Sequence, residues 1–439
     1  MPPQAVINNP RLDYFNKPPL NVTNQAYSLQ VIDPASTPVQ DGPITFNVTS
    51  DNAFLNFEES ILRFKLRVVL PDGENLAQAM DNHVAFVPNI FHSIFTQIRV
   101  RVNGIRVSPS NDLYSYKAYI DELLDQTKDG AYLNELSGGL YDAGGEDAVG
   151  EDNPNWALRA AKCNRSALAE YSGQLRLDFL NGSRNIIPAS RISIELFPQY
   201  PRFVIQRDDN PAVENVNFKF EITEPQLIVR REEIAPEVAM AIETRLAKQM
   251  INYYYDLGCV IPFNIRHGTY TFKCDNIFNS QFPKKVIVAF TRSTAFNGTY
   301  DTSPFYFNPT EHLEQVEFFK NGVRTGLQRA FSIDLAEGGT DKHMAYRELH
   351  KAVNGVNTKA GLPFSLAAFR QGYFLTGIDL TPDGRDDLAH HYPTDTSTFS
   401  ISVKFRQPPE NDLEMLVYGV FSETLSMNQS RQVVTTLNI

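Results

Sequence analysis

The sequence predicts an all-β protein that contains two copies of one antiparallel β-sandwich domain and a few short helices. Three observations indicate this fold class: many segments alternate apolar and polar residues, few segments have helical periodicity, and the order of elements repeats after about half the chain. With 439 residues, the chain is longer than a single hydrophobic core normally supports, so two domains are expected.

Strands are predicted where apolar residues recur at every second position, because such a strand has one face on a core and one face in solvent. Residues 97–107, for example, place isoleucine and valine on one face and arginine on the other. Six segments have this alternation: residues 59–70, 97–107, 173–180, 191–197, 216–222 and 398–405.

Two Asn-Gly pairs lie between strand-like runs, Asn103-Gly104 and Asn321-Gly322. Asparagine and glycine tolerate the positive φ angles of a type I′ turn, so each pair predicts a β-hairpin.

Three segments have helical periodicity: residues 111–124, 235–250 and 341–353. Pro236 lies in the first turn of the second segment, where no intrahelical hydrogen bond is lost. Asn111 and Asp341 are the predicted N-caps of the other two helices.

The order of these elements repeats along the chain. In each half, a hairpin with an Asn-Gly turn precedes a short helix, which contains Tyr119 or Tyr346, and three strands follow. The residues alone favour two sandwiches and leave open whether they have jelly-roll or other Greek-key connections. The expected division is residues 1–40 as an N-terminal arm or strap, 41–234 as the first domain, 235–250 as a junction helix and 251–439 as the second domain.

Composition argues against several classes of function. The chain has 40 Lys and Arg against 51 Asp and Glu, with no basic cluster, so we expect no direct sequence-specific binding to nucleic acid. No stretch approaches 18 consecutive apolar residues, so we expect no membrane span. Three cysteines, Cys163, Cys259 and Cys274, are expected to be buried free thiols.

Motifs of known catalytic and metal sites are missing from the sequence. It contains no GxSxG, P-loop, GxGxxG, HExxH or HxH motif. His343 and His350 would lie two helical turns apart, about 10 Å, which is too far for one metal ion. We therefore assign no catalytic, cofactor or metal site and expect no enzyme.

An acidic, glycine-rich stretch lies within residues 125–160, which we expect to be a loop. Its carboxylates do not match the spacing of an EF-hand, so a solvated insertion is favoured over a calcium site. Such insertions gather at the ends of a sandwich, so we expect an outer-loop interface here. The candidate residues are Asp142, Glu146, Asp147, Glu151 and Asp152.

Several stretches resemble the double jelly-roll major capsid proteins of Polinton (Maverick) elements and adintoviruses, which are of the adenovirus hexon type. The most distinctive are the Asn-Gly hairpin before the tyrosine-rich helix and the block AFNGTYDTSPF at 295–305. The resemblance runs in order through residues 41–73, 87–124, 172–181, 224–238, 282–307, 369–383 and 416–427.

The resemblance implies two tandem eight-stranded antiparallel jelly rolls in each chain. It also implies a homotrimer that forms a pseudo-hexameric capsomer, contacts between capsomers, an icosahedral shell around double-stranded DNA, and a single jelly-roll penton or minor capsid protein as a partner. The protein would be made in the host cytoplasm and be located in the virion, with assembly in the cytoplasm or the nucleus. Two alternatives stay open: a double-sandwich enzyme of cupin-like or glycan-acting type, and a carbohydrate- or receptor-binding sandwich.

Overall fold

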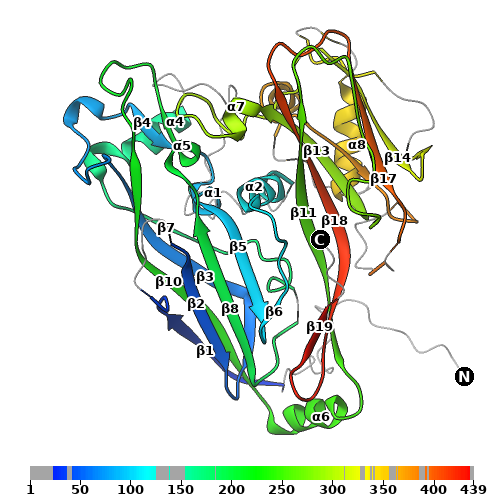
Figure 1. Cartoon of the computed structure of the whole chain (residues 1–439). Coiled ribbons are helices and arrows are strands. Elements are labelled where there is room, and N and C mark those ends of the chain that lie inside the picture. Colours follow the sequence, from blue (N-terminus) through cyan, green and yellow to red (C-terminus); the bar gives the residue numbers. More distant parts are fainter. Residues whose placement is uncertain are drawn as a thin grey trace, which may run out of the picture.

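The chain folds into two lobes that stand side by side, each made of two antiparallel sheets (Figure 1). The structure is a computed structural model. It describes residues 23–36, 42–124, 138, 154–182, 184–310, 312–326, 332–336, 339, 342–354, 362, 364–384, 391–392 and 395–435.

The first lobe contains eight sandwich strands. They are β1 (Asn24–Ile32), β2 (Ile44–Ser50), β3 (Phe54–Val69), β5 (Phe95–Val102), β6 (Ile105–Arg106), β7 (Ala169–Gly173), β8 (Ser190–Pro198) and β10 (Lys219–Ile234). One sheet has the order β1-β10-β3-β7 and the other has the order β2-β8-β5-β6. A separate two-stranded ribbon pairs β4 (Val84–Phe86) with β9 (Ile205–Arg207).

The second lobe has the same number of sandwich strands. They are β11 (Ile251–Ile265), β12 (Thr271–Cys274), β13 (Lys285–Arg292), β14 (Leu313–Lys320), β15 (Val323–Arg324), β16 (Leu375–Asp379), β17 (Phe399–Phe405) and β18 (Leu413–Met427). The sheet orders are β11-β18-β13-β16 and β12-β17-β14-β15, and the short β19 (Val433–Thr435) pairs with β18.

Both lobes have one topology. If the eight sandwich strands of each lobe are numbered along the chain, the two sheets read 1-8-3-6 and 2-7-4-5 in both lobes. This order is the jelly roll, in which two Greek keys fold into one sandwich. The prediction of two tandem eight-stranded jelly rolls is therefore confirmed, and we call the lobes the first and the second roll.

The predicted strands and helices are confirmed with one exception. Residues 173–180 do not form a strand, because β7 ends at Gly173 and a turn follows. The alternation there does reflect burial, but Phe179 packs edge-on against Tyr253 and Tyr255 of the second roll rather than within a sheet. The segment is thus buried by the contact between the rolls.

The longer helices occupy the predicted positions: α2 (Tyr114–Leu124), α6 (Pro236–Leu246) and α8 (His343–Asn354). Asn111 is not the N-cap, because α2 begins only at Tyr114; its side-chain amide donates to the Val260 carbonyl on β11. Asp341 lies outside the described residues. The predicted loop 125–160 ends in a helix, α4 (Pro154–Ala161). The one-turn helices are α1 (Ile90–Ser93), α5 (Pro201–Val204), α7 (Ser293–Phe296) and α9 (Leu366–Arg370).

The segment expected to be an N-terminal arm or strap, residues 1–40, contributes a strand to the first roll. Strand β1 lies within residues 1–40, and it pairs with β10 from Asn24 opposite Ile234 to Ile32 opposite Leu227. The first roll therefore includes residues that precede position 41. Helix α6 then links β10 to β11 at one end of both rolls (Figure 1).

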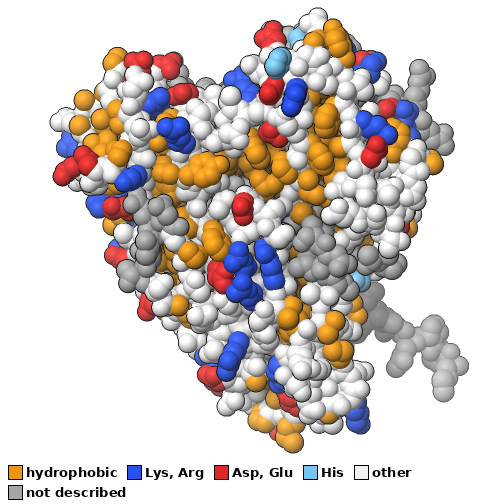
Figure 2. Space-filling view, in the orientation of Figure 1, with side chains coloured by type: hydrophobic (Ala, Val, Ile, Leu, Met, Phe, Trp, Pro, Cys, Tyr) orange, Lys and Arg blue, Asp and Glu red, His pale blue; other side chains and the backbone are white. Residues whose placement is uncertain are grey.

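A single continuous cluster of buried apolar residues extends through both rolls. Cys163, Cys259 and Cys274 are buried and form no disulfide. Figure 2 shows that the lobes touch along most of their length and separate at the end opposite α6, with hydrophobic side chains gathered below the notch. The contact between the rolls is therefore part of the hydrophobic core.

Candidate functional site

The helix α2 lies between the two rolls and is buried on almost all sides. The Tyr119 ring stacks on Phe305, with ring centroids 4.3 Å apart, and meets Phe307 edge-on. The Tyr116 ring stacks on Phe296 with centroids 5.5 Å apart. Because the three phenylalanines belong to the second roll, these aromatic pairs fix the helix of the first roll to its neighbour.

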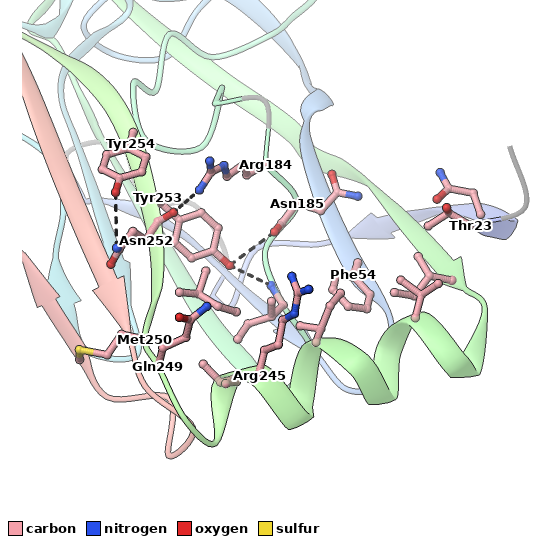
Figure 3. Close-up of a pocket in the computed structure, with 17 residues that line it drawn as sticks. Thr23, Phe54, Arg184, Asn185, Arg245, Gln249, Met250, Asn252, Tyr253 and Tyr254 are labelled. Carbon is pink, nitrogen blue, oxygen red and sulfur yellow. Dashed lines mark hydrogen bonds between the residues drawn. The ribbon is translucent and has the colours of Figure 1, made fainter. Parts of the chain in front are cut away.

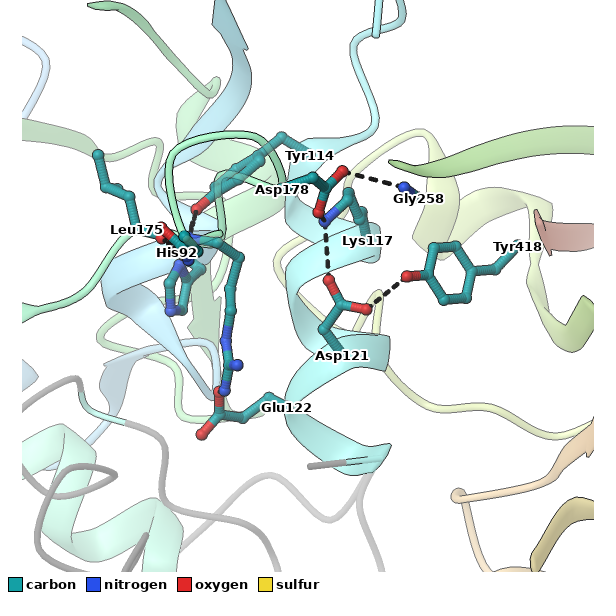
Figure 4. Close-up of polar contacts among 11 residues, drawn as sticks. His92, Tyr114, Lys117, Asp121, Glu122, Leu175, Asp178, Gly258 and Tyr418 are labelled. Atoms are coloured by element: carbon teal, nitrogen blue, oxygen red, sulfur yellow. Dashed lines mark hydrogen bonds and ion pairs between the residues drawn. The ribbon is translucent and has the colours of Figure 1, made fainter. Parts of the chain in front are cut away.

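A buried ionic network lies beside these rings (Figure 4). Lys117 Nζ is 2.8 Å from Asp121 Oδ2 and 2.7 Å from Asp178 Oδ1. The second roll contributes two donors: the Gly258 backbone N–H donates to Asp178 Oδ2 at 2.9 Å, and the Tyr418 hydroxyl donates to Asp121 Oδ1 at 2.6 Å. Each carboxylate therefore joins the first roll to the second.

The protonation states follow from this arrangement. Burial alone would lower the pKa of Lys117, but the charges of Asp121 and Asp178 raise it above its usual value. Burial raises the pKa of Asp178, against the opposing effect of Lys117. Burial and the Asp121 charge raise the pKa of Tyr418 well above its usual value. Lys117 is therefore charged and Tyr418 is a hydroxyl donor at neutral pH.

A buried histidine adjoins the same helix. His92 Nδ1 is 2.9 Å from the Tyr114 hydroxyl, and Arg176 makes an ion pair with Glu122 at 2.6 Å. Burial lowers the pKa of His92 well below its usual value, and the positive charges of Arg176 and Lys117 lower it further. His92 is therefore neutral in the folded protein at neutral pH.

The contact between the rolls also provides hydrogen-bond partners for backbone groups at the free edge of β11. This strand lies at the edge of its sheet, so every second residue has backbone groups that face away from β18. Side chains of the first roll bind three such groups: Asp178 accepts from Gly258 N–H, Asn111 donates to the Val260 carbonyl at 2.6 Å, and Arg184 donates to the Asn252 carbonyl.

Gly258 has no room for a side chain. A Cβ atom there would lie 2.5 Å from the Tyr418 hydroxyl oxygen and 2.8 Å from Lys117 Cε. Glycine is thus required for the close approach of α2 to β11.

A second contact joins the rolls near α6. Arg431, in the turn between β18 and β19, donates through Nε to the Pro188 carbonyl at 2.8 Å. Its guanidinium also pairs with Glu243 of α6 at 2.6 Å, and its own carbonyl accepts from the Asn103 side chain at 2.8 Å. This turn therefore fixes the second roll to both the junction helix and the first hairpin.

A cavity of about 620 Å³ lies between α6 and the two rolls (Figure 3). Val238, Ile242 and Leu246 line it from α6, and the Tyr253 hydroxyl on its wall accepts from Ile187 N–H. In the part of the chain that the structure describes, no group of three or more His, Cys, Asp or Glu gathers to hold a metal ion. No described helix is long and apolar enough to cross a membrane.

The two predicted hairpin turns have equivalent geometry. Asn103 and Gly104 have φ angles of 49° and 86°, and Asn321 and Gly322 have φ angles of 50° and 77°. Each asparagine also binds the start of the seventh strand of its roll through its side chain. Asn103 Oδ1 accepts from Arg191 N–H at 2.7 Å, and Asn321 Oδ1 accepts from Thr398 N–H at 2.9 Å.

The structure does not describe the acidic residues that the sequence proposed for an interface, and the sequence analysis did not identify the ionic network. Asp142, Glu146, Asp147, Glu151 and Asp152 lie outside the described residues. Sequence reasoning missed Lys117, Asp121 and Asp178. A signal existed for the first two, since a lysine four residues before an aspartate in a helix rich in tyrosine suggests a buried ion pair. Asp178 could be found only from the fold.

Comparison with known proteins supports the fold. No family model matches the chain. A Caenorhabditis elegans protein described as uncharacterized protein F54H12.2 is 23% identical over 398 residues, which cover 89% of this chain and 87% of that protein.

Solved structures align along nearly the whole chain. A chain of the Sputnik virophage structure has a TM-score of 0.63 and 13% identity over 99% of this chain and 93% of that chain. The mavirus major capsid protein has a TM-score of 0.56 and 12% identity over 97% and 93%. The Faustovirus major capsid protein has a TM-score of 0.52 and 9% identity over 94% and 92%. With the strand order above, these likenesses identify the fold as the double jelly roll found in viral capsid proteins.

Proposed function

We propose that this chain is a major capsid protein, a structural subunit without catalytic activity. The observation that carries the proposal is the pair of rolls with one strand order, which aligns over 97% of the chain with the mavirus major capsid protein. The fixed contact between the rolls supports it, because a shell subunit must hold its two rolls in one orientation.

In this proposal, three copies form a homotrimer whose six rolls give a pseudo-hexameric capsomer. Capsomers assemble through many weak contacts into an icosahedral shell around double-stranded DNA. A net charge of −11 fits a wall that encloses DNA without binding it in a sequence-specific way. A single jelly-roll penton or minor capsid protein would close the vertices, and the mature location would be the virion.

We assign the chain to the Polinton, Maverick or adintovirus branch. The ordered sequence stretches between residues 41 and 427 that resemble this branch support the assignment. We also propose that the acidic residues between Asp142 and Asp152, in the connection between α2 and α4, form an outer-loop interface.

The mass of the purified protein in solution tests the proposal. Light scattering should give three times the chain mass of 49.6 kDa, with larger assemblies at higher protein concentration. A strict monomer at every salt concentration, pH and protein concentration would contradict the capsid function.

A further inference from the structure

Each roll has two sides that matter for contacts between rolls. The helix side has the helix between the fifth and sixth strands, which is α2 in the first roll and α8 in the second. The edge side has the first strand, β1 or β11, at the edge of its sheet. Within the chain, the helix side of the first roll contacts the edge side of the second, through Lys117, Asp121 and Asp178.

Among the residues that the structure describes, none covers the edge side of the first roll. Strand β1 has nine residues with no charge and no proline, although edge strands of soluble proteins usually have one or the other. Tyr27, Leu29 and Val31 are 64%, 60% and 53% exposed. Among the described residues, no side chain binds the backbone of residues 25–32, whereas three bind that of β11.

The apolar surface continues across the sheet at Val31, whereas Leu29 lies opposite Arg230, whose guanidinium is 4.5 Å from the centre of the Tyr27 ring. Val31 lies opposite Ile228, which lies opposite Ile61, so the three form one row on the outer face. Ile61 is 43% exposed. On the equivalent face of the second roll, Val260 and Tyr418 are 1% and 5% exposed, because the first roll covers them. The same face is thus covered in one roll and open in the other.

The helix side of the second roll is open as well. Almost every residue of α2 is buried, whereas α8 buries only one face, with Ala345, Leu349 and Ala352. His343, Met344 and Arg347 remain exposed on α8. In the described part of the chain, one side of each kind is therefore left without a partner.

We propose that the helix side of the second roll of a neighbouring copy covers β1 and the row Val31–Ile228–Ile61. This inference rests on the proposed function, and it names the surface through which the copies meet. A contact between two different sides is heterologous, and it closes into a ring when the rotation allows. Three copies then form six such contacts, three within chains and three between them.

The test uses the full-length protein and three measurements. Leu29→Lys replaces the central apolar side chain of β1 by a second positive charge opposite Arg230, and Leu158→Lys makes the same change on α4 at a side chain that is 55% exposed. Light scattering gives the mass of each variant, and circular dichroism gives its folding. Hydrogen exchange of the peptide that spans residues 24–32, compared between the wild-type protein and L29K, reports whether association protects β1 beyond its pairing with β10.

The proposal expects a wild-type trimer whose β1 exchanges more slowly than that of L29K, a folded L29K monomer and a trimeric L158K variant. A trimeric L29K variant, or exchange in β1 that is equally fast in the wild-type trimer and in an L29K monomer, overturns the inference and leaves the capsid function standing. A wild-type dimer that L29K dissociates would mean that β1 pairs with β1 of a second copy, and it also overturns the inference. A wild-type protein that is always monomeric overturns the proposed function itself.

Discussion

The network at Lys117 allows a quantitative test of how the two rolls are held together. In Lys117→Met, the apolar stem stays but the charge is lost, which leaves the carboxylates of Asp121 and Asp178, 21% and 16% exposed, without a cation. Removing one partner of a buried ion pair costs about 3–5 kcal/mol, because the remaining charge is uncompensated. The side chain of Lys117 is 7% exposed, so solvent screening does not reduce this value much. We expect the free energy of unfolding to fall by about 3–5 kcal/mol.

The matched control is Lys65→Met. Lys65 lies 2.7 Å from Glu224, a distance like that in the buried network, but the two side chains are 29% and 58% exposed. Exposed pairs contribute about 0–1 kcal/mol, so this variant should unfold almost like the wild type.

Urea unfolding can be followed by fluorescence of the single tryptophan, Trp156 in the first roll, and by circular dichroism of the whole chain. Adding Asp121→Asn and Asp178→Asn to Lys117→Met should recover most of the loss, because no buried charge then remains. If Lys117→Met costs no more than Lys65→Met, the buried network does not hold the rolls together.

Three further variants test other parts of the account by the same unfolding measurement. Gly258→Ala should cost about 1–3 kcal/mol through overpacking, and the cost should shrink when Tyr418→Ala removes the clashing ring; equal costs in both backgrounds would contradict the close approach. The lowered pKa of His92 means that the unfolded chain gains a proton first, so stability should fall by up to about 1.4 kcal/mol per pH unit below pH 6.5. His92→Gln should lose most of this slope, and an unchanged slope would refute the assignment. Asn321→Ala should cost about 1–3 kcal/mol, through its positive φ and lost hydrogen bonds, and Asn103→Ala at least as much. A neutral Asn321→Ala would refute the structural role of the turn.

Local patterns in the sequence predicted most of the fold. Alternation in residues 191–197 and 398–405 predicted strands that the structure contains as β8 and β17, because one face of each strand is buried in its own roll. The same rule failed at 173–180, where Phe179 is buried by the other roll. Periodicity records that a residue is buried and does not record which element buries it.

The contact between the rolls was much less predictable. Asn111 fits the pattern of an N-cap, and only the fold reveals that its amide binds the edge of β11. Asp178 and Gly258 lie 80 residues apart, so nothing local joins them. β1 was missed because residues 1–40 as a whole are rich in proline and asparagine and have little periodicity, although Tyr27, Leu29 and Val31 do alternate with polar residues. Interactions between segments that are distant in the sequence could therefore be identified only from the three-dimensional structure.

Electron microscopy of the purified wild-type protein tests whether two equivalent rolls build a shell. The account predicts threefold particles with a hexagonal outline, which contain six similar densities and join into closed shells as the protein concentration rises. Separate two-lobed particles that never associate would contradict it, since a subunit with two fixed rolls and no self-contact cannot form a capsid.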